Sequence, residues 1–131
     1  MGLDREEIAA LFDKLAKGEK EYFFDHVADD VDWTVTGRHP IAGRYTKKAD
    51  FVAATCRIDN ALERKILFKV QHILVDGDVT VIEMESEAVA KNGEPFNNAY
   101  CWVVTFAFGK ICKVRAYVDS ASVAKLLAEN E

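Results

Sequence analysis

The chain has few prolines and cysteines, lacks a basic excess and contains no long apolar run. It has 2 prolines and 3 cysteines in 131 residues, and 17 Lys and Arg stand against 22 Asp and Glu, for a formal net charge of −5. This acidic balance argues against a nucleic-acid partner, which would require a basic face. No apolar stretch is long enough to cross a bilayer, so we expect no membrane partner.

Cys56, Cys101 and Cys112 make an odd number without the spacing of a disulfide framework. No CxxC is present, and His26 and His72 have no carboxylates at ligand spacing, so we expect neither a metal site nor a cofactor. Free thiols fit a reducing compartment, and the acidic start of the chain is unlike a signal peptide. We therefore expect a cytoplasmic protein.

The length predicts one domain over residues 1–131 with a real core. Helical spacing comes first along the chain and strand-like alternation follows, which is typical of an α+β fold. Asp4 and Glu7 form a capping box for the first helix, and Thr46 is expected to cap the third. We predict one helix after Asp4, one over 22–27, one after Thr46 and one after Asp119. The predicted strands cover 31–37, 66–75, 79–90, 96–108 and 111–118. The segment 38–45 is expected to be loop.

Turn signals join the later strands into a four-strand antiparallel meander. Asp76-Gly77 and Asn92-Gly93 are typical hairpin turns, and Gly109 marks the last one. The strands on either side of Gly109 are rich in β-branched and aromatic residues on both faces. Such a pair needs cover on both sides, so we expect a pocket under the helices and a partner subunit on the outer face.

Three local motifs carry a resemblance to a known family. They are the acidic turn Asp29-Asp30-Val31-Asp32-Trp33, the loop Gly37-Arg38-His39-Pro40-Ile41-Ala42-Gly43-Arg44-Tyr45, and Gly109-Lys110-Ile111 followed by Val114-Arg115-Ala116-Tyr117-Val118-Asp119. In their order and spacing they resemble the SnoaL-like branch of the nuclear transport factor 2-like superfamily, which includes ketosteroid isomerases, limonene epoxide hydrolases, polyketide cyclases and dehydratases. The resemblance implies a cone-shaped α+β barrel, in which a curved, mostly antiparallel sheet wraps around the N-terminal helices. It also implies an apolar pocket and frequent homodimers.

The register of the last hairpin decides which side chains face the pocket. An even register turns Tyr100 and Trp102 to the same side as Ala116, whereas a shift by one residue joins them to Arg115 and Tyr117. We favour the even register, because the position matching Ala116 faces the cavity in the resembled isomerases and epoxide hydrolases. The expected ligand-binding residues are then Trp33, Tyr45, Phe51, Met84, Ser86, Asn98, Tyr100, Trp102, Val114, Ala116 and Val118, with Val104, Cys112 and Ile82 on the same face.

The catalytic residues of the resembled enzymes are missing. Epoxide hydrolases of this fold need a carboxylate where Ala116 stands, and an Arg and an Asp where Met84 and Ser86 stand. Epoxide hydrolysis is therefore disfavoured, since no paired carboxylates flank a substrate. The isomerases need a carboxylate base and oxyanion donors; Tyr100 could supply a hydroxyl donor on the pocket face, but the pattern is not reproduced.

Three residues remain as catalytic candidates: Tyr100, His39 and Asp119. His39, in a loop before Pro40, is more simply explained as a solvated histidine, and Asp119 as a helix cap. The spacing of Glu83, Glu85 and Glu87 places them on one strand face, which we expect to be wet or part of an interface.

Three functions stay open. The first, which we favour, is binding of a small hydrophobic or cyclic metabolite in an aromatic-lined pocket. The second is an isomerase, cyclase or dehydratase that uses acid–base chemistry in that pocket, and the third is a protein-interaction module. With each of them we expect a homodimer through the outer sheet face, which would carry Cys101, Val103 and Thr105 beside Lys113, Arg115 and Tyr117.

Overall fold

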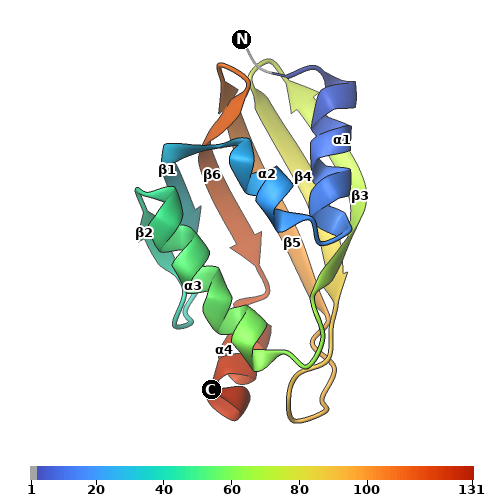
Figure 1. The fold of residues 1–131 in the computed structure, drawn as a ribbon, viewed down its shortest axis with the longest axis vertical. Helices are drawn as coiled ribbons and strands as arrows, with labels where there is room; N and C mark the ends of the chain where they lie inside the picture. The colour runs from blue at the N-terminus through green and yellow to red at the C-terminus, as the bar shows by residue number, and fades with distance from the viewer. Residues whose placement is uncertain (1–2) are drawn as a thin grey trace.

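The computed structural model describes residues 3–131, which form an α+β fold with one curved sheet and helices on one side of it (Figure 1). The fold class agrees with the prediction. The elements in chain order are α1 (Arg5–Ala16), α2 (Lys20–Asp25), β1 (Val27–Val35), β2 (Gly43–Tyr45), α3 (Lys48–Ala61), β3 (Leu67–Asp76), β4 (Val79–Glu87), β5 (Asn98–Ala107), β6 (Lys110–Val118) and α4 (Ser120–Asn130).

The sheet has six strands in the order β2-β1-β6-β5-β4-β3. β3 to β6 form the predicted antiparallel meander, and β1 joins it by pairing parallel with β6. β2 lies in the stretch predicted to be loop and pairs antiparallel with β1. The sheet is therefore two strands wider than the meander predicted from the sequence.

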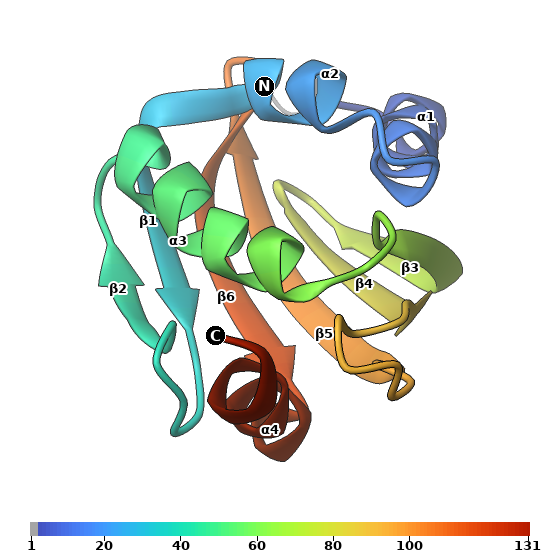
Figure 2. The ribbon, with the colours of Figure 1, turned by 60° about the horizontal axis from the view of Figure 1, so that its bottom comes forward.

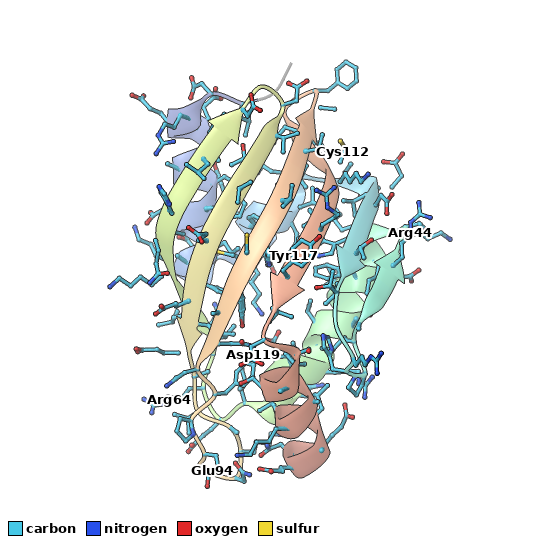
Figure 3. The ribbon with its side chains drawn as sticks, turned by 180° about the vertical axis from the view of Figure 1, so that it is seen from behind. Arg44, Arg64, Glu94, Cys112, Tyr117 and Asp119 are labelled. Carbon is cyan, nitrogen blue, oxygen red and sulfur yellow. The ribbon has the colours of Figure 1, made fainter. Side chains whose placement is uncertain are left out.

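The helices cover the concave face of the sheet. α1, α2 and α3 lie across this face, and α4 closes one end of it (Figures 1 and 2). Seen from behind, the outer face of the sheet carries no helix of the described part of the chain (Figure 3). The interior between the sheet and α3 is therefore the place where a cavity can form.

The first helix begins as the sequence predicts. The Glu7 amide donates to the Asp4 carboxylate at 2.8 Å, and the Asp4 amide donates to the Glu7 carboxylate at 3.2 Å. This reciprocal capping box satisfies two amide groups that the first helical turn would leave unpaired. The apolar stripe of α1 then faces the sheet, with Ile8, Leu11, Phe12 and Leu15 all buried.

The last hairpin has the even register that we favoured. Trp102 pairs with Ala116, and Tyr100 pairs with Val118. A bulge between Thr105 and Phe106 then shifts the pairing by one residue near the turn. The prediction that Cys112 shares the pocket face is therefore wrong: within residues 3–131 Cys112 is left out of the pairing between β5 and β6, and its thiol donates to the Thr105 carbonyl at 3.4 Å.

Two predicted helix boundaries are wrong. Val27, expected at the end of the second helix, opens β1, where it pairs with Ile111. Thr46 does not cap α3, because the helix begins one residue later and Lys47 holds the cap position without a side-chain hydrogen bond. The difference at Val27 arises because pairing with the distant β6 outweighs the local helical signal.

The start of β1 and two strand ends also differ from the prediction. β1 begins at Val27 rather than residue 31, and β4 ends at Glu87 rather than residue 90. β1 ends at Val35, two residues before Gly37, which has a φ of +110°. A Cβ on Gly37 would lie 2.6 Å from Cβ of Ser120, so this turn brings the loop against the start of α4.

The apolar core falls into two clusters. The larger packs α1, α2 and the middle of the sheet around Phe12, Phe23 and Trp33. The smaller joins α3, α4 and the loop after β4 around Leu62, Phe96 and Leu126. Phe68 packs against both clusters, so the two meet beside β3.

The three cysteines differ in their exposure. Cys56 is exposed, and Cys101 and Cys112 are half-buried; all three are free thiols. Among residues 3–131, no helix combines the length and the apolar character that crossing a bilayer requires.

Candidate functional site

A cavity of about 130 Å³ lies between the concave face of the sheet and α3. Its volume is close to that of an apolar cavity that takes up benzene, about 150 Å³. The cavity therefore has room for about one six-membered ring. Its lining consists of Leu15, Lys20, Phe24, Trp33, Val35, His39, Ile41, Phe51, Thr55, Ile58, Asp59, Ile66, Phe68, Tyr100, Trp102, Ala116, Val118 and Val123.

Aromatic rings form one wall of the cavity. Trp33 stacks on Phe51 with ring centroids 4.0 Å apart, and Trp102 meets Trp33 edge-on at 5.2 Å. Phe24 adds a tilted contact with Phe51 at 6.1 Å. Offset-stacked and edge-to-face pairs are the favoured geometries of aromatic rings. This side of the cavity is therefore apolar and built from closely packed aromatic rings.

One face of α3 continues the lining from Phe51 onward. Phe51, Thr55, Ile58 and Asp59 follow one another at helical spacing and all line the cavity. The helix is only weakly amphipathic, and the sequence assigned only Phe51 of α3 to the binding site. The lining residues of α2 and α3 were accordingly missed, apart from Phe51.

Tyr100, which is half-buried, places a phenolic hydroxyl in the cavity lining. Its Oη lies 3.0 Å from Oγ of Ser86, which is itself buried. Burial raises the pKa of Tyr100 to about 12, although hydrogen bonds with Ser86 and Asn98 act in the opposite direction. Tyr100 is therefore protonated at neutral pH and is a hydrogen-bond donor, not a base.

Two ring nitrogens in the lining have no partner among residues 3–131. They are Nε1 of Trp33 and Nε2 of His39, and both atoms are buried. The Ile41 amide donates to Nδ1 of His39 at 3.3 Å, so the neutral ring carries its proton on Nε2. Burial lowers the pKa of His39 and so favours the neutral ring.

The lining also contains one ion pair, which sequence reasoning did not find. Nζ of Lys20 lies 2.8 Å from each carboxylate oxygen of Asp59. The two side chains are 27% and 39% exposed, and no other charged side chain lines the cavity. Thirty-nine positions separate them in the chain, so no local motif could have joined them.

The predicted binding residues divide into two groups. Trp33, Phe51, Tyr100, Trp102, Ala116 and Val118 line the cavity. Tyr45, Met84, Ser86, Asn98 and Val114 are not part of its lining. Met84, Ser86, Asn98 and Val114 are buried, and Ser86 contacts the hydroxyl of Tyr100. Tyr45 donates to the Ile41 carbonyl at 2.7 Å and packs edge-on against Phe51, so it holds the loop beside the cavity.

The three catalytic candidates do not form one group in the structure. His39 and Tyr100 line the cavity, whereas Asp119 caps α4 by accepting from the Ser122 amide at 3.4 Å. Glu83, Glu85 and Glu87 are exposed, as predicted. Among residues 3–131, no three His, Cys, Asp or Glu side chains gather as a metal ion would require.

Comparison with known sequences identifies the family. A sequence model of the SnoaL-like domain matches residues 8–114. The chain belongs to the SnoaL-like family.

Two curated fungal proteins are similar to it. The chain is 30% identical over 129 residues to dimerizing cyclase phiC of a fungal species, covering 95% of this chain and 57% of that protein. It is 30% identical over 118 residues to dimerizing cyclase tstC of Talaromyces stipitatus, covering 86% of this chain and 52% of that protein. The chain thus spans little more than half the length of these relatives.

Solved structures agree on the fold. An NTF2-like protein of Burkholderia thailandensis superposes with a TM-score of 0.78 at 19% identity, covering 93% of this chain and 95% of that one. TerC, co-crystallized with polyporic acid, gives a TM-score of 0.74 at 18% identity, covering 94% and 96%. IdmH of Streptomyces antibioticus, named as a candidate polyketide cyclase, gives 0.72 at 15% identity, also covering 94% and 96%. The fold is NTF2-like.

Proposed function

We propose that the protein binds a small hydrophobic metabolite with a flat ring in the cavity under α3. The observation that carries the proposal is the cavity itself, which has room for about one ring and a wall of stacked aromatic side chains. Binding sites for small molecules are typically apolar, with a few fixed polar groups. Tyr100 provides such a group, because its hydroxyl stays protonated and is held by Ser86.

A variant that fills the cavity tests this proposal. Ala116 lies opposite Trp102, is 4% exposed and lines the cavity, so Ala116→Leu places a larger side chain where the ligand would sit. Ala99→Leu is the matched control, because Ala99 lies on the same sheet but is exposed.

The measurement is a thermal-shift screen of one-ring and two-ring aromatic and alicyclic compounds, followed by calorimetry on the compounds that stabilise the protein. We expect wild type and Ala99→Leu to bind the same compounds, and Ala116→Leu to bind none. Equal binding by all three proteins would place the ligand elsewhere and refute the proposal.

A cyclase or isomerase reaction in the same cavity is the second candidate. It is favoured by the two curated relatives, which are named cyclases, and by the presence of ionisable groups in an apolar lining. Tyr100, however, pairs with Ser86 rather than with a carboxylate or an imidazole. Catalysis would therefore need to use the other polar groups of the lining.

We also propose that the protein is a homodimer formed through the outer sheet face. On this face Val103 lies beside Arg115, and Cys101 lies beside Tyr117, which is 44% exposed and labelled in Figure 3. The exposed Glu83 and Glu85 lie on the neighbouring strand β4. Apolar side chains between opposite charges suit a self-complementary two-fold interface.

The three free thiols fit a reducing compartment such as the cytoplasm, which we propose as the site of action.

A further inference from the structure

We propose that Lys20 and Asp59 form a recognition site for the hydroxyl group of a phenol or cyclic enol. The inference rests on the proposed function, since the ring of such a ligand would occupy the cavity. It adds the chemical class of the ligand and assigns a binding role to two residues outside the aromatic wall.

The pair stands where the cavity meets the surface. Lys20 is the first residue of α2, and Asp59 lies in the last turn of α3. Both line the cavity and both stay partly exposed, so a ligand that enters the cavity can reach them. The rest of the lining is almost entirely apolar, which strengthens electrostatic contacts made there.

The hydrogen-bonding capacity of the pair is only partly used. A lysine ammonium has three donors, and Lys20 directs contacts only to the two oxygens of Asp59 among residues 3–131. The carboxylate of Asp59 has further lone pairs. A donor and an acceptor are therefore available side by side.

A hydroxyl group matches this arrangement better than other groups of similar size. Its proton can be donated to Asp59 while its oxygen accepts from Lys20. A ketone would use only the lysine, and a carboxylate would be repelled by Asp59. The pair carries no net charge, so it favours a neutral polar group over an anion.

The pair is not the only link between α2 and α3. Nζ of Lys48, on α3, donates to the Phe24 carbonyl at 2.9 Å and to the Val27 carbonyl at 3.1 Å. Phe24 also contacts Phe51. The far end of α2 is thus anchored to α3 independently of Lys20, so replacing Lys20 is expected to leave the fold intact.

The experiment compares 4-fluorophenol with 4-fluorotoluene, which are nearly equal in shape and differ in the hydroxyl. Dissociation constants are measured by fluorine NMR for wild type, Lys20→Met and Asp59→Asn. Lys17→Met is the matched control, because Lys17 also makes a 2.8 Å ion pair, with Asp13, but lies outside the cavity. Tyr100→Phe tests the other hydroxyl-binding group of the lining.

We expect wild type and Lys17→Met to bind 4-fluorophenol more tightly than 4-fluorotoluene, although the latter is more hydrophobic. Lys20→Met and Asp59→Asn should each weaken 4-fluorophenol binding about tenfold, as expected for a charge-assisted hydrogen bond, and change 4-fluorotoluene binding less than twofold. 4-Fluorobenzoate should bind wild type more weakly than 4-fluorophenol.

Other outcomes separate the two proposals. Equal losses for both probes in Lys20→Met and Asp59→Asn would make the pair structural and overturn this inference, while the proposed function would stand. Loss of the phenol preference in Tyr100→Phe alone would assign the hydroxyl to Tyr100 and overturn it too. If wild type binds neither probe nor any compound of the wider screen, the proposed function fails and the inference fails with it. If a variant does not fold, the fluorine shift of bound 4-fluorophenol in wild type decides, because a shift equal to that in an apolar solvent would contradict a hydrogen bond.

Discussion

The indole of Trp33 on β1 lies flat against the phenyl ring of Phe51 on α3, with 4.0 Å between ring centroids and 20° between the ring planes. Trp33 is fully buried and Phe51 is 7% exposed. This contact fixes α3 to the sheet and forms the aromatic wall of the cavity. The stability of the fold and the shape of the site therefore depend on the same pair of rings.

Replacing Phe51 by alanine should strongly destabilise the protein. The change removes a buried ring and leaves a void beside Trp33, so we expect a loss of about 3–5 kcal/mol in the free energy of unfolding. Urea denaturation followed by tryptophan fluorescence measures it. Phe108→Ala is the control, because Phe108 is 94% exposed and its loss should cost about 0.5 kcal/mol or less. Similar losses for both variants would contradict the packing described.

Side chains on the two faces of the sheet should respond differently to truncation. Trp102 contacts Phe12, Phe23 and Trp33, whereas Glu85 is exposed on the outer face. Trp102→Ala and Tyr100→Ala should each cost about 3 kcal/mol or more, and Glu85→Ala about 0.5 kcal/mol or less. Calorimetry gives the melting temperatures that check this ranking. Equal decreases in melting temperature for the three variants would contradict the face assignment.

The sequence was a good guide where local signals decide the structure. Asp76-Gly77 predicted the hairpin between β3 and β4, and the capping box of Asp4 and Glu7 predicted the start of α1. The alternation of β4 also placed Met84 and Ser86 inside and Glu85 outside. In each of these cases neighbouring residues determine the outcome, with little help from distant parts of the chain.

The sequence was a poor guide where distant segments meet. The bulge at Thr105 depends on how β5 fits β6, and it moved Cys112 off the pocket face. The pairing of Val27 with Ile111 began β1 four residues earlier than the alternation of 31–37 suggested. Lys20 and Asp59 come together only because α2 and α3 fold over the same cavity. Such contacts follow from tertiary packing, which local propensity does not determine.

Tyr100 should make the protein less stable at alkaline pH. Its pKa is about 12 in the folded protein and about 10 when unfolded, so above pH 10 the unfolded chain loses a proton that the folded chain retains. The free energy of unfolding should therefore fall between about pH 10 and pH 12, by about 2–3 kcal/mol in total. Denaturant titrations across this range measure the free energy of unfolding of wild type and Tyr100→Phe. The decrease caused by Tyr100 should be present in wild type and absent from the variant. Identical slopes would show that Tyr100 is not buried as described.

His39 should make the protein less stable at acidic pH. Burial lowers its pKa below the ordinary value of 6.5, so as pH falls below 6.5 the unfolded chain takes up a proton before the folded chain does. The contribution of His39 is complete above pH 6.5 and declines as pH falls toward the folded pKa. NMR titration of the three histidine rings should give a midpoint below 6.5 for His39. His39→Gln should make the free energy of unfolding depend less on pH in this range. A midpoint at or above 6.5 would contradict the burial of the ring.

Breaking the outer face should separate the proposed homodimer. Val103 lies near the centre of that face, between Val81 on β4 and Arg115 on β6, so Val103→Lys would place two unpaired charges at a two-fold interface. Light scattering at micromolar concentration should give wild type twice the 14.7 kDa mass of one chain, and Val103→Lys the mass of one chain.

High salt should weaken the wild-type dimer if Arg115 meets Glu83 or Glu85 of the partner subunit, since salt screens exposed charges. Tyr22→Lys is the control: Tyr22 is an exposed apolar side chain (47%), but it lies on α2 and away from the outer face, so its replacement should leave the dimer intact. A wild-type mass of 14.7 kDa that neither dilution nor salt changes would rule the dimer out.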